Sequence, residues 1–530
     1  MRTSRGTGAW SWAGIVAGFA GLATSYALAM ALTIRESPVV AVAELVIRVT
    51  PGRVVEEAIA RLGFWDKPLL IGGILLFLAV LFAYAGRLAA RGPWQPLTVW
   101  LPLTAVGAVA VVVQRGQTLV DYLPLALGLA TWVVVLRLLA AVLRREQAAA
   151  AGADATGAAF DEPVAVADEG RPGAASSRRT FLLASGAVAL VAAATTGLGR
   201  VVGAGRRGVE ASRRLLKIDG VTEPSVPAKA RIGLDGVSPW MTPNEDFYLI
   251  HTAIVVPTIA PGDWSVRIHG MVEREVVLTY ADLLERERTE AWVTLNCVSN
   301  PVGGNLIGNA WWSGVRLDAL LAEAGPLPGA DAVKQTSHDG WTCGTPLTAL
   351  TDGRDAMLAV AMNGKPLPIE HGFPVRTIVP GLYGFVSACK WVVDIEVTRF
   401  ADFTAYWTGK GWSAQGPVKI ASRIDVPRQG QDVEAGKVQV GGVAWHQRTG
   451  IDAVEVSLDG GGWQRAAVAS VPTDDTWVQW ALTLDDVPPG DHEVRVRAIG
   501  KDGDVQTGVE RDVVPDGATG WHGVEFTARA

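Results

Sequence analysis

The most informative segment of the chain is residues 293–300, Val293-Thr294-Leu295-Asn296-Cys297-Val298-Ser299-Asn300. Its apolar and β-branched residues predict a strand that ends at a cysteine. Glycine-rich backbone follows from Pro301 to Asn309, and then comes the hydrophobic run Ala310-Trp311-Trp312-Ser313-Gly314-Val315. A thiol at a strand end, facing flexible loop backbone, is well placed to contact a ligand.

A second informative stretch lies about seventy residues further along the chain. It reads Leu367-Pro368-Ile369-Glu370-His371-Gly372-Phe373-Pro374-Val375-Arg376, and it is followed by Val379-Pro380-Gly381-Leu382-Tyr383-Gly384 and Ala388-Cys389-Lys390-Trp391. Histidine, arginine and lysine spaced along a loop-rich segment suit an anionic, phosphate-bearing group. Glycine and proline in the same segment allow close approach of the backbone to such a group.

Together these motifs resemble the sulfite oxidase family of molybdenum enzymes, from about Lys217 to the C-terminus. The resemblance implies that Cys297 is the catalytic thiolate ligand of the molybdenum, and that His371 and Arg376 contact the molybdopterin cofactor. It implies further cofactor contacts at Phe247, Tyr248, His251, Asp339, Ala388, Cys389 and Lys390. A soft thiolate suits a polarisable metal that two dithiolene sulfurs already hold.

The chain departs from the family at the substrate pocket. Ile250, Pro301 and Val302 stand where sulfite oxidases place arginines. Because paired cations bind oxyanions strongly, their loss argues against sulfite as the substrate. Tyr406 and Trp407 lie near the expected catalytic tyrosine, but their spacing differs, so that role has no residue assigned to it.

The C-terminal half of the chain reads as two domains. Residues 204–422 mix strand-like runs (Trp264 to Ile268, Val392 to Val397) with helix-like pieces (Tyr280 to Arg286, Leu317 to Ala324), which predicts an α+β molybdopterin-binding domain. Residues 423–530 alternate apolar and polar side chains, with turns and several tryptophans, which predicts an immunoglobulin-like β-sandwich. The resemblance implies that this sandwich serves dimerisation, so a homodimer is expected.

The N-terminal part reads as membrane protein, since 49% of the whole chain is hydrophobic and only 19% is charged. Five spans are predicted, four within residues 1–143 and a fifth within 180–203. They cover about Trp10 to Ile34, Pro68 to Gly86, Trp94 to Val113, Leu119 to Leu143 and Phe181 to Val202. Pro38 to Leu62 carries too much charge for a span and is predicted to be an amphipathic helix at the interface.

Arginines flank the predicted spans with a bias that places the N-terminus in the cytoplasm and the C-terminal half outside it. Residues 144–179, rich in alanine, glycine and acids from Ala148 on, are predicted to be a cytoplasmic linker. At its end, Arg178-Arg179 before an apolar stretch resembles a twin-arginine export signal placed internally. An ordinary cytoplasmic stop of two arginines is the alternative.

Charge and histidine placement exclude other functions. The net charge of −6, without a long basic run, argues against nucleic-acid binding. All seven histidines follow the last predicted span, so no bis-histidine haem is expected among the helices. The three cysteines form no CxxC or CxxCH motif, which implies a separate electron carrier. The sequence therefore predicts a membrane-anchored, extracytoplasmic molybdopterin oxidoreductase that transfers oxygen atoms to or from a small substrate; the alternative is a cofactor-free binding or adhesion protein.

Overall fold

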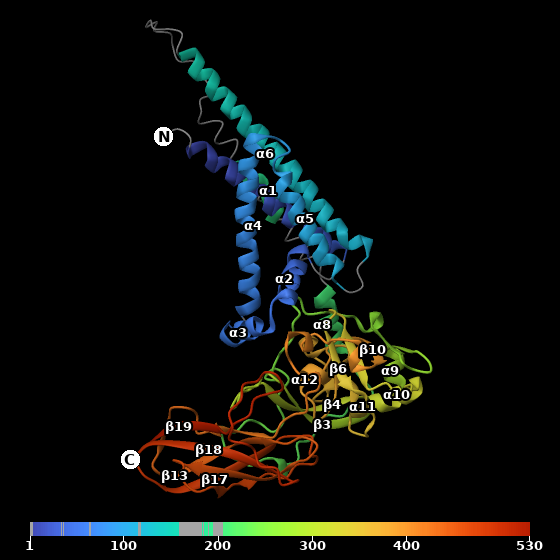
Figure 1. The fold of residues 1–530 in the computed structure, drawn as a ribbon, viewed down its shortest axis with the longest axis vertical. Helices are drawn as coiled ribbons and strands as arrows, with labels where there is room; N and C mark the ends of the chain where they lie inside the picture. The colour runs from blue at the N-terminus through green and yellow to red at the C-terminus, as the bar shows by residue number, and fades with distance from the viewer. Residues whose placement is uncertain are drawn as a thin grey trace. The chain divides into compact units, whose positions relative to one another are not determined.

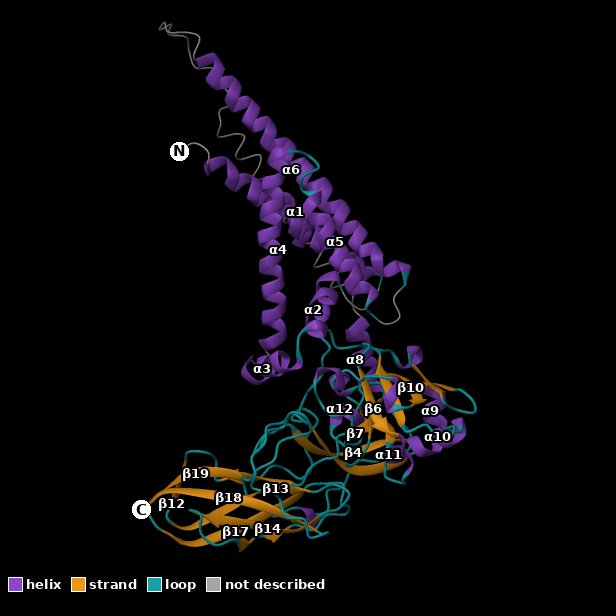
Figure 2. Ribbon diagram, in the orientation of Figure 1, coloured by secondary structure: helices purple, strands orange, loops and turns teal. Residues whose placement is uncertain are grey.

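A computed structural model describes residues 4–32, 34, 37–62, 65–114, 118–157, 183, 185–188, 190–193 and 205–530. It divides into two compact units. The helical unit comprises Met1–Gly208 with Ala253–Val255, and the β-rich unit comprises Val209–Thr252 with Val256–Ala530. Figure 1 traces the chain through both units, and Figure 2 shows that all strands belong to the second.

The helical unit is built from long apolar helices. Among the described residues, three segments are long and apolar enough to cross a membrane: Thr7–Ala31, Asp66–Arg91 and Leu119–Arg145. A fourth apolar helix has 16 residues, fewer than the roughly 20 that a span needs. The elements are α1 (Ser4–Ala31), α2 (Pro38–Val49), α3 (Gly52–Leu62), α4 (Asp66–Arg91), α5 (Leu97–Val112), η2 (Leu119–Tyr122) and α6 (Leu123–Gly157).

Small residues let α1 and α4 pack closely. A Cβ atom added to Gly14 of α1 would lie 2.7 Å from the Cα atom of Gly86 in α4, and one added to Gly86 would meet the carbonyl of Trp10. Glycine at such contacts allows the backbones of membrane helices to approach each other. The aromatic rings of Phe82 and Trp132, 5.4 Å apart, fill the space beside them.

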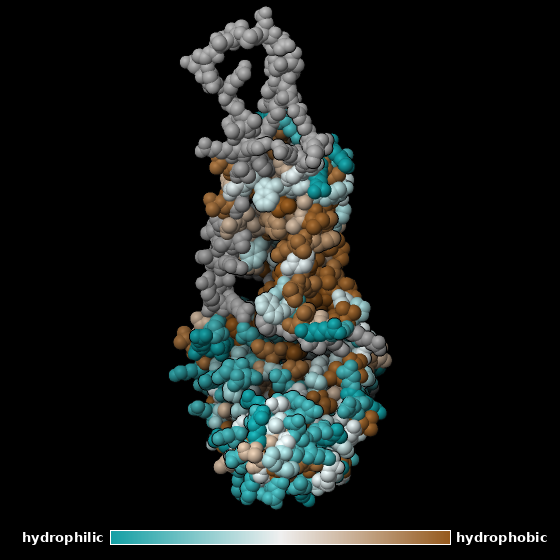
Figure 3. All heavy atoms as spheres, turned by 90° about the vertical axis from the view of Figure 1, so that its left-hand side faces the viewer, coloured by the Kyte–Doolittle hydropathy of each residue, from teal (hydrophilic) through white to brown (hydrophobic). Residues whose placement is uncertain are grey.

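The outer faces of these helices are apolar. Leu69, Leu76, Phe77 and Val80 of α4 are all exposed, as large hydrophobic residues seldom are on a soluble protein. Figure 3 shows hydrophobic side chains gathered over the long helices of this unit. This surface is consistent with membrane association, because leucine and phenylalanine side chains favour the bilayer core.

Two expectations for this unit need correction. The predicted amphipathic helix over Pro38 to Leu62 is two helices, α2 and α3, because Pro51 cannot donate its backbone N–H to continue the first. Helix α6 continues to Gly157, inside the predicted linker, since its alanines favour helix strongly. The rest of the linker and Arg178-Arg179 lie outside the described residues, as does most of the predicted fifth span.

The β-rich unit begins with α8 (Gly205–Leu215), which starts at the boundary between the units, and then forms two mixed α+β layers. One sheet has the order β2-β1-β10-β5-β6, in which β1 and β10 are parallel. The other has the order β3-β4-β7-β8, with β9 also on β7, so β3 is an edge strand. The bounds are β1 (Ser265–Gly270), β2 (Val276–Thr279), β3 (Thr289–Asn296), β4 (Ile307–Arg316), β5 (Ala332–Ser337), β6 (Thr342–Pro346), β7 (Met357–Met362), β8 (Lys365–Pro366), β9 (Arg376–Ile378) and β10 (Val392–Thr398).

Short helices connect these strands, and the predicted ones are confirmed. They are α9 (Tyr280–Glu285), α10 (Leu317–Ala324), α11 (Leu347–Thr351) and α12 (Gly384–Ser387), with the 3-10 turns η3 (Ala228–Ala230), η4 (Pro261–Asp263), η5 (Ile369–His371), η6 (Phe400–Asp402) and η7 (Thr408–Lys410). Helix α9 starts at a capping box in which Thr279 accepts from the backbone N–H of Asp282. Thus local sequence signals set the limits of the element.

The C-terminal region consists of two further sheets that share one core. Their orders are β11-β13-β17-β16 and β12-β19-β18-β14-β15. Val440 and Trp480 of the first sheet and Val454 and Val496 of the second are fully buried in that core, as the alternation of apolar residues predicts. The bounds are β11 (Ala421–Val426), β12 (Gln431–Glu434), β13 (Gly436–Trp445), β14 (Ile451–Leu458), β15 (Gln464–Arg465), β16 (Ala467–Val468), β17 (Val478–Val487), β18 (Gly490–Gly500) and β19 (His522–Arg529).

Candidate active site

Cys297 follows directly after β3, as the sequence predicts. Its backbone N–H donates to the carbonyl of Leu306 at 2.9 Å, and its own carbonyl accepts from the N–H of Asn300 at 3.1 Å. These bonds extend the β3–β4 ladder by one residue and then turn the chain. The side chain is buried, with 9% of the residue exposed. The thiol therefore has a fixed position at the end of a rigid strand.

Tyr248 lies beside this strand end. A Cβ atom added to Gly384 would lie 3.7 Å from the Tyr248 hydroxyl and 3.8 Å from the carbonyl of Asn296, so the three groups converge. Burial raises the pKa of Tyr248, and the nearby Cys297 sulfur adds to the shift. The phenol therefore keeps its proton at neutral pH and can donate a hydrogen bond. Glycine at position 384 leaves open the space that a side chain would fill.

His371 lies in the turn η5, and its ring contacts Phe247, which in turn stacks on Tyr248. Its Nε2 atom is 3.1 Å from the carbonyl oxygen of Asn244, which can only accept, so Nε2 carries the proton. Burial, helped by Lys390 and Arg376, lowers the pKa of His371 to about 3. The ring is therefore neutral, and its buried Nδ1 offers a lone pair that has no partner among the described residues.

Arg376 is the most deeply buried cation of this group, with 3% of the residue exposed. Its Nη1 donates to the carbonyl of His371 at 3.0 Å, and its guanidinium carbon lies 5.2 Å from the centre of the Trp312 ring. Burial lowers the pKa of Arg376 to about 10, so it remains charged at neutral pH. Its buried Nε has no hydrogen-bond partner within the described part of the chain, where the guanidinium also forms no salt bridge. A buried cation in this state requires an anion.

Lys390 brings a second cation to the group. Its ammonium donates to the carbonyl of Glu370 at 2.9 Å. Gly372 lets the two cationic segments meet, because a Cβ atom there would lie 2.9 Å from the Cβ of Arg376 and 3.2 Å from the Cα of Lys390. Gly372 also has φ +111°, a conformation that only glycine adopts readily. The next residue, Trp391, contacts the ring of His251 at 5.9 Å between centroids.

The remaining predicted contacts occupy supporting positions. Phe247 is a core residue that packs edge-on against the ring of His371, 5.7 Å away. Ala388 lies beside Gly384, since a Cβ atom added to Gly384 would be 3.7 Å from the Cβ of Ala388. Cys389 is fully buried, with its thiol beside that of Cys343, and burial raises its pKa. Asp339 accepts from the N–H of Trp341 at 3.0 Å, as in an ordinary Asx turn.

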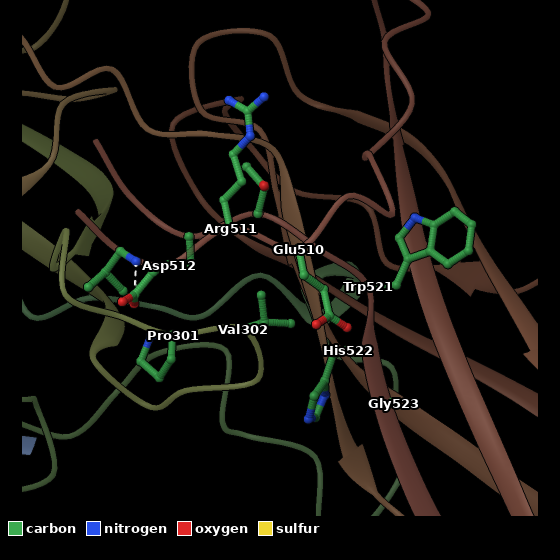
Figure 4. Close-up of a pocket in the computed structure, with 11 residues that line it drawn as sticks. Pro301, Val302, Glu510, Arg511, Asp512, Trp521, His522 and Gly523 are labelled. Carbon is green, nitrogen blue, oxygen red and sulfur yellow. Dashed lines mark hydrogen bonds between the residues drawn. The ribbon is translucent and has the colours of Figure 1, made fainter. Parts of the chain in front are cut away.

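A cavity of about 470 Å³ lies beside the loop that follows Cys297. Figure 4 shows Pro301 and Val302 on one wall, and Glu510, Asp512 and His522 from the C-terminal region around it. Arg511 also lines the cavity, between two acids. Two of the three positions at which the sequence comparison with the family predicts lost arginines, Pro301 and Val302, therefore line a space that a small molecule could enter.

The groups at the site fit the molybdenum cofactor. Arg376, which forms no salt bridge among the described residues, and Lys390 would hold the anionic part of the cofactor. His371, whose Nδ1 has no partner among the described residues, could accept a hydrogen bond from the cofactor, and the thiolate of Cys297 would hold the molybdenum. Two buried polar atoms support this fit, because His371 Nδ1 and Arg376 Nε have no partner among the described residues and lie on neighbouring side chains, where a single ligand could satisfy both.

Sequence reasoning missed several supporting residues. Trp312 lies in the hydrophobic run that follows the Cys297 loop, but nothing in the sequence indicates that the Arg376 guanidinium packs over its ring. Asn244 holds His371 through its backbone, a contact that depends on tertiary structure alone. Tyr383 is buried near Cys297, and burial raises its pKa to about 12. Only its place in the predicted loop could have drawn attention to it.

Comparison with known proteins gives concordant results. A family model described as "Oxidoreductase molybdopterin binding domain" matches residues 253–407. An uncharacterised oxidoreductase of Bacillus subtilis, YuiH, is 31% identical over 180 residues, which cover 34% of this chain and 87% of that protein. Human mitochondrial sulfite oxidase is 28% identical over 309 residues, which cover 48% of this chain and 55% of that protein.

The chain thus spans about half the length of the mammalian mitochondrial sulfite oxidases that it matches. Among solved structures, the sulfane dehydrogenase SoxCD of Paracoccus pantotrophus aligns with 25% identity and a TM-score of 0.45, over 56% of this chain and 82% of that chain. The matched family region contains Cys297, His371, Arg376 and Lys390.

Proposed function

Since the chain belongs to the sulfite oxidase family of molybdopterin-dependent oxidoreductases, we propose that it is an enzyme of oxygen-atom transfer whose substrate is a small molecule other than sulfite. The buried Arg376 guanidinium, which lacks an anionic partner among the described residues, carries the proposal. A cofactor phosphate bound there would offset the free-energy cost of burying this charge. When bound, the molybdenum cofactor supplies a metal-oxo centre that exchanges one oxygen atom and two electrons with a substrate.

The residues of the chain have distinct tasks in this proposal. Cys297 would hold the metal from a rigid strand end, and Arg376 and Lys390 would bind the anionic part of the cofactor. His371 stays neutral and accepts a hydrogen bond, which fixes the orientation of the pterin. Tyr248 keeps its proton beside Cys297 and can donate a hydrogen bond to an oxygen at the reacting centre.

The substrate proposal rests on the cavity beside the Cys297 loop. Pro301 and Val302 line it without charge, while Glu510 and Asp512 flank Arg511. A sulfite dianion would therefore meet little net positive charge there, whereas neutral sulfoxides or N-oxides would pay no comparable desolvation penalty.

We also propose that the apolar helices anchor the enzyme in the membrane with the active site on the extracytoplasmic side. This proposal includes five spans, an internal twin-arginine signal at Arg178-Arg179, and a separate electron carrier. The two C-terminal sheets are proposed to be an immunoglobulin-like domain that forms a homodimer. Light scattering of the full chain in detergent tests the dimer, and labelling of single engineered cysteines on either side of the membrane tests the orientation.

Metal analysis tests the central proposal. The full chain, produced in a host that makes molybdopterin, is expected to contain about one molybdenum atom per chain. The Cys297→Ser variant is expected to lose most of it. Cys343→Ser is the matched control, because Cys343 is also a buried cysteine of this unit but lies on β6. A wild-type chain without molybdenum would refute the proposal, and equal molybdenum in wild type and Cys297→Ser would remove the thiolate from the metal site.

A further inference from the structure

Strand β3, which ends just before Cys297, is an edge strand of its sheet, and the C-terminal region covers its outer edge. Strand β3 pairs with β4 on one side only. On its other side, the N–H of Thr294 donates to the carbonyl of Asp475 at 3.0 Å, and the N–H of Trp477 donates to the Thr294 hydroxyl at 2.9 Å. The carbonyl of Thr294 accepts from the Nε2 of Gln447. Thr294 is three residues before Cys297.

Gln447 is the side chain that ties this contact together. Its Nε2 also donates to the carbonyl of Asp475 at 3.1 Å, so one amide bridges the edge of β3 and the segment that covers it. Two carbonyl acceptors fix the orientation of the amide, since only its NH₂ end can donate to both. The residue is 5% exposed, so water cannot readily replace these bonds.

The loop after Cys297 is held by the same region. Arg423 of β11 donates from Nη1 to the carbonyl of Gly304 at 2.9 Å. At Gly303, a Cβ atom would collide with the ring of His522 from β19. The backbone on both sides of Cys297 is therefore fixed by Arg423 of β11 and by Gln447 of the loop after β13, which lie more than a hundred positions away in the sequence.

We propose that Gln447 is a positioning residue for Cys297: its amide fixes the edge of β3 and thereby the place from which the thiolate reaches the metal. The proposal rests on the proposed function, because it takes Cys297 to be the metal ligand. It assigns the C-terminal region a task inside the active site in addition to any role in association. Groups that orient a metal ligand from outside commonly change metal affinity or activity about 10- to 100-fold when removed.

Gln447→Met tests the proposal, because methionine has similar length but no donor. Gln447→Glu is a stronger perturbation, since it places a carboxylate against two carbonyl oxygens. Gln479→Met is the matched control. Gln479 is 6% exposed, accepts from the N–H of Ile232 at 2.8 Å and donates to the carbonyl of Ser238 at 2.7 Å, so it links the same two parts of the unit without touching β3.

Three measurements on the full chain separate positioning from general stability. In the molybdenum-loaded protein, Gln447→Met is expected to lose the metal about 10-fold faster than Gln479→Met, and its thiolate-to-molybdenum absorption band is expected to shift. In chain made without the cofactor, hydrogen exchange across residues 289–297 is expected to be faster in Gln447→Met alone. Equal metal loss with an unshifted band in the two variants would overturn the proposal.

The exchange measurement also separates this proposal from the proposed function. If the wild-type chain bound no molybdenum, the proposed function would fail. Faster exchange at 289–297 in Gln447→Met than in Gln479→Met would then still support the control of the Cys297 strand by Gln447. Equal exchange in the two variants would refute it.

Discussion

The Arg376 side chain allows the sharpest prediction, because its removal should change the stability of the cofactor-free chain little and cofactor binding strongly. In the cofactor-free chain, burial lowers the pKa of Arg376 from its ordinary value to about 10. This difference corresponds to about 3 kcal/mol of unfavourable free energy for the charged form in the folded state. Arg376→Met removes that cost.

The same substitution removes favourable contacts as well. The hydrogen bond to the His371 carbonyl contributes about 1–2 kcal/mol. The contact with the Trp312 ring adds about 1–2 kcal/mol. The losses and the gain nearly cancel, so the apparent melting temperature of cofactor-free Arg376→Met should stay within about 4 °C of wild type. Molybdenum content, in contrast, should fall to a small fraction of the wild-type value, since the cofactor loses a buried cation.

The assay compares thermal unfolding of the cofactor-free full chain in detergent with molybdenum content of chain made in a competent host. Arg316→Met is the control, because Arg316 forms salt bridges with Asp318 at 2.6 Å and with Asp355 at 2.9 Å. That variant should keep wild-type molybdenum. A large destabilisation of cofactor-free Arg376→Met, together with full molybdenum content, would show that Arg376 stabilises the fold and does not bind the cofactor.

Three further predictions concern other parts of the chain. The folded-state pKa of His371, about 3, lies below its usual 6.5, so the stability that neutral His371 gives the cofactor-free chain is lost as pH falls from about 6.5 toward 3. Between pH 7 and 4.5, the melting temperature of His371→Gln should therefore fall less than that of wild type. An equal fall in the two proteins would contradict a buried neutral ring. Gly372→Ala should reduce molybdenum content, because its Cβ would press on Arg376. Gly353→Ala is the control, since Gly353 also has a positive φ but open space around it, so this variant should lower the melting temperature through backbone strain and keep its molybdenum. Metal analysis and melting curves of both variants check this. Leu76→Arg, on the exposed face of α4, should weaken membrane insertion by about 3 kcal/mol, and an unchanged membrane fraction after alkaline extraction would argue against this helix as a span.

Local sequence patterns predicted the family and many elements of the fold, whereas the cofactor contacts of the site residues stay predictions. The strand ending at Cys297 and the α9 and α10 helices follow from spacing of apolar residues over a few positions. The apolar helices of the N-terminal unit follow from composition. Errors occurred where one residue outweighs a pattern, as at Pro51, which divides the predicted interfacial helix.

The sequence by itself determined the elements and the chemical types at the site, because periodicity, turn residues and short motifs act over neighbouring residues. Tertiary packing was needed to show that His371 is neutral and that Arg376 has no anionic partner among the described residues, since burial and charged neighbours set both. It alone also brought Gln447 to the edge of β3, across 153 positions of sequence. Contacts over such separations depend on how whole sheets pack, and no local pattern encodes that packing.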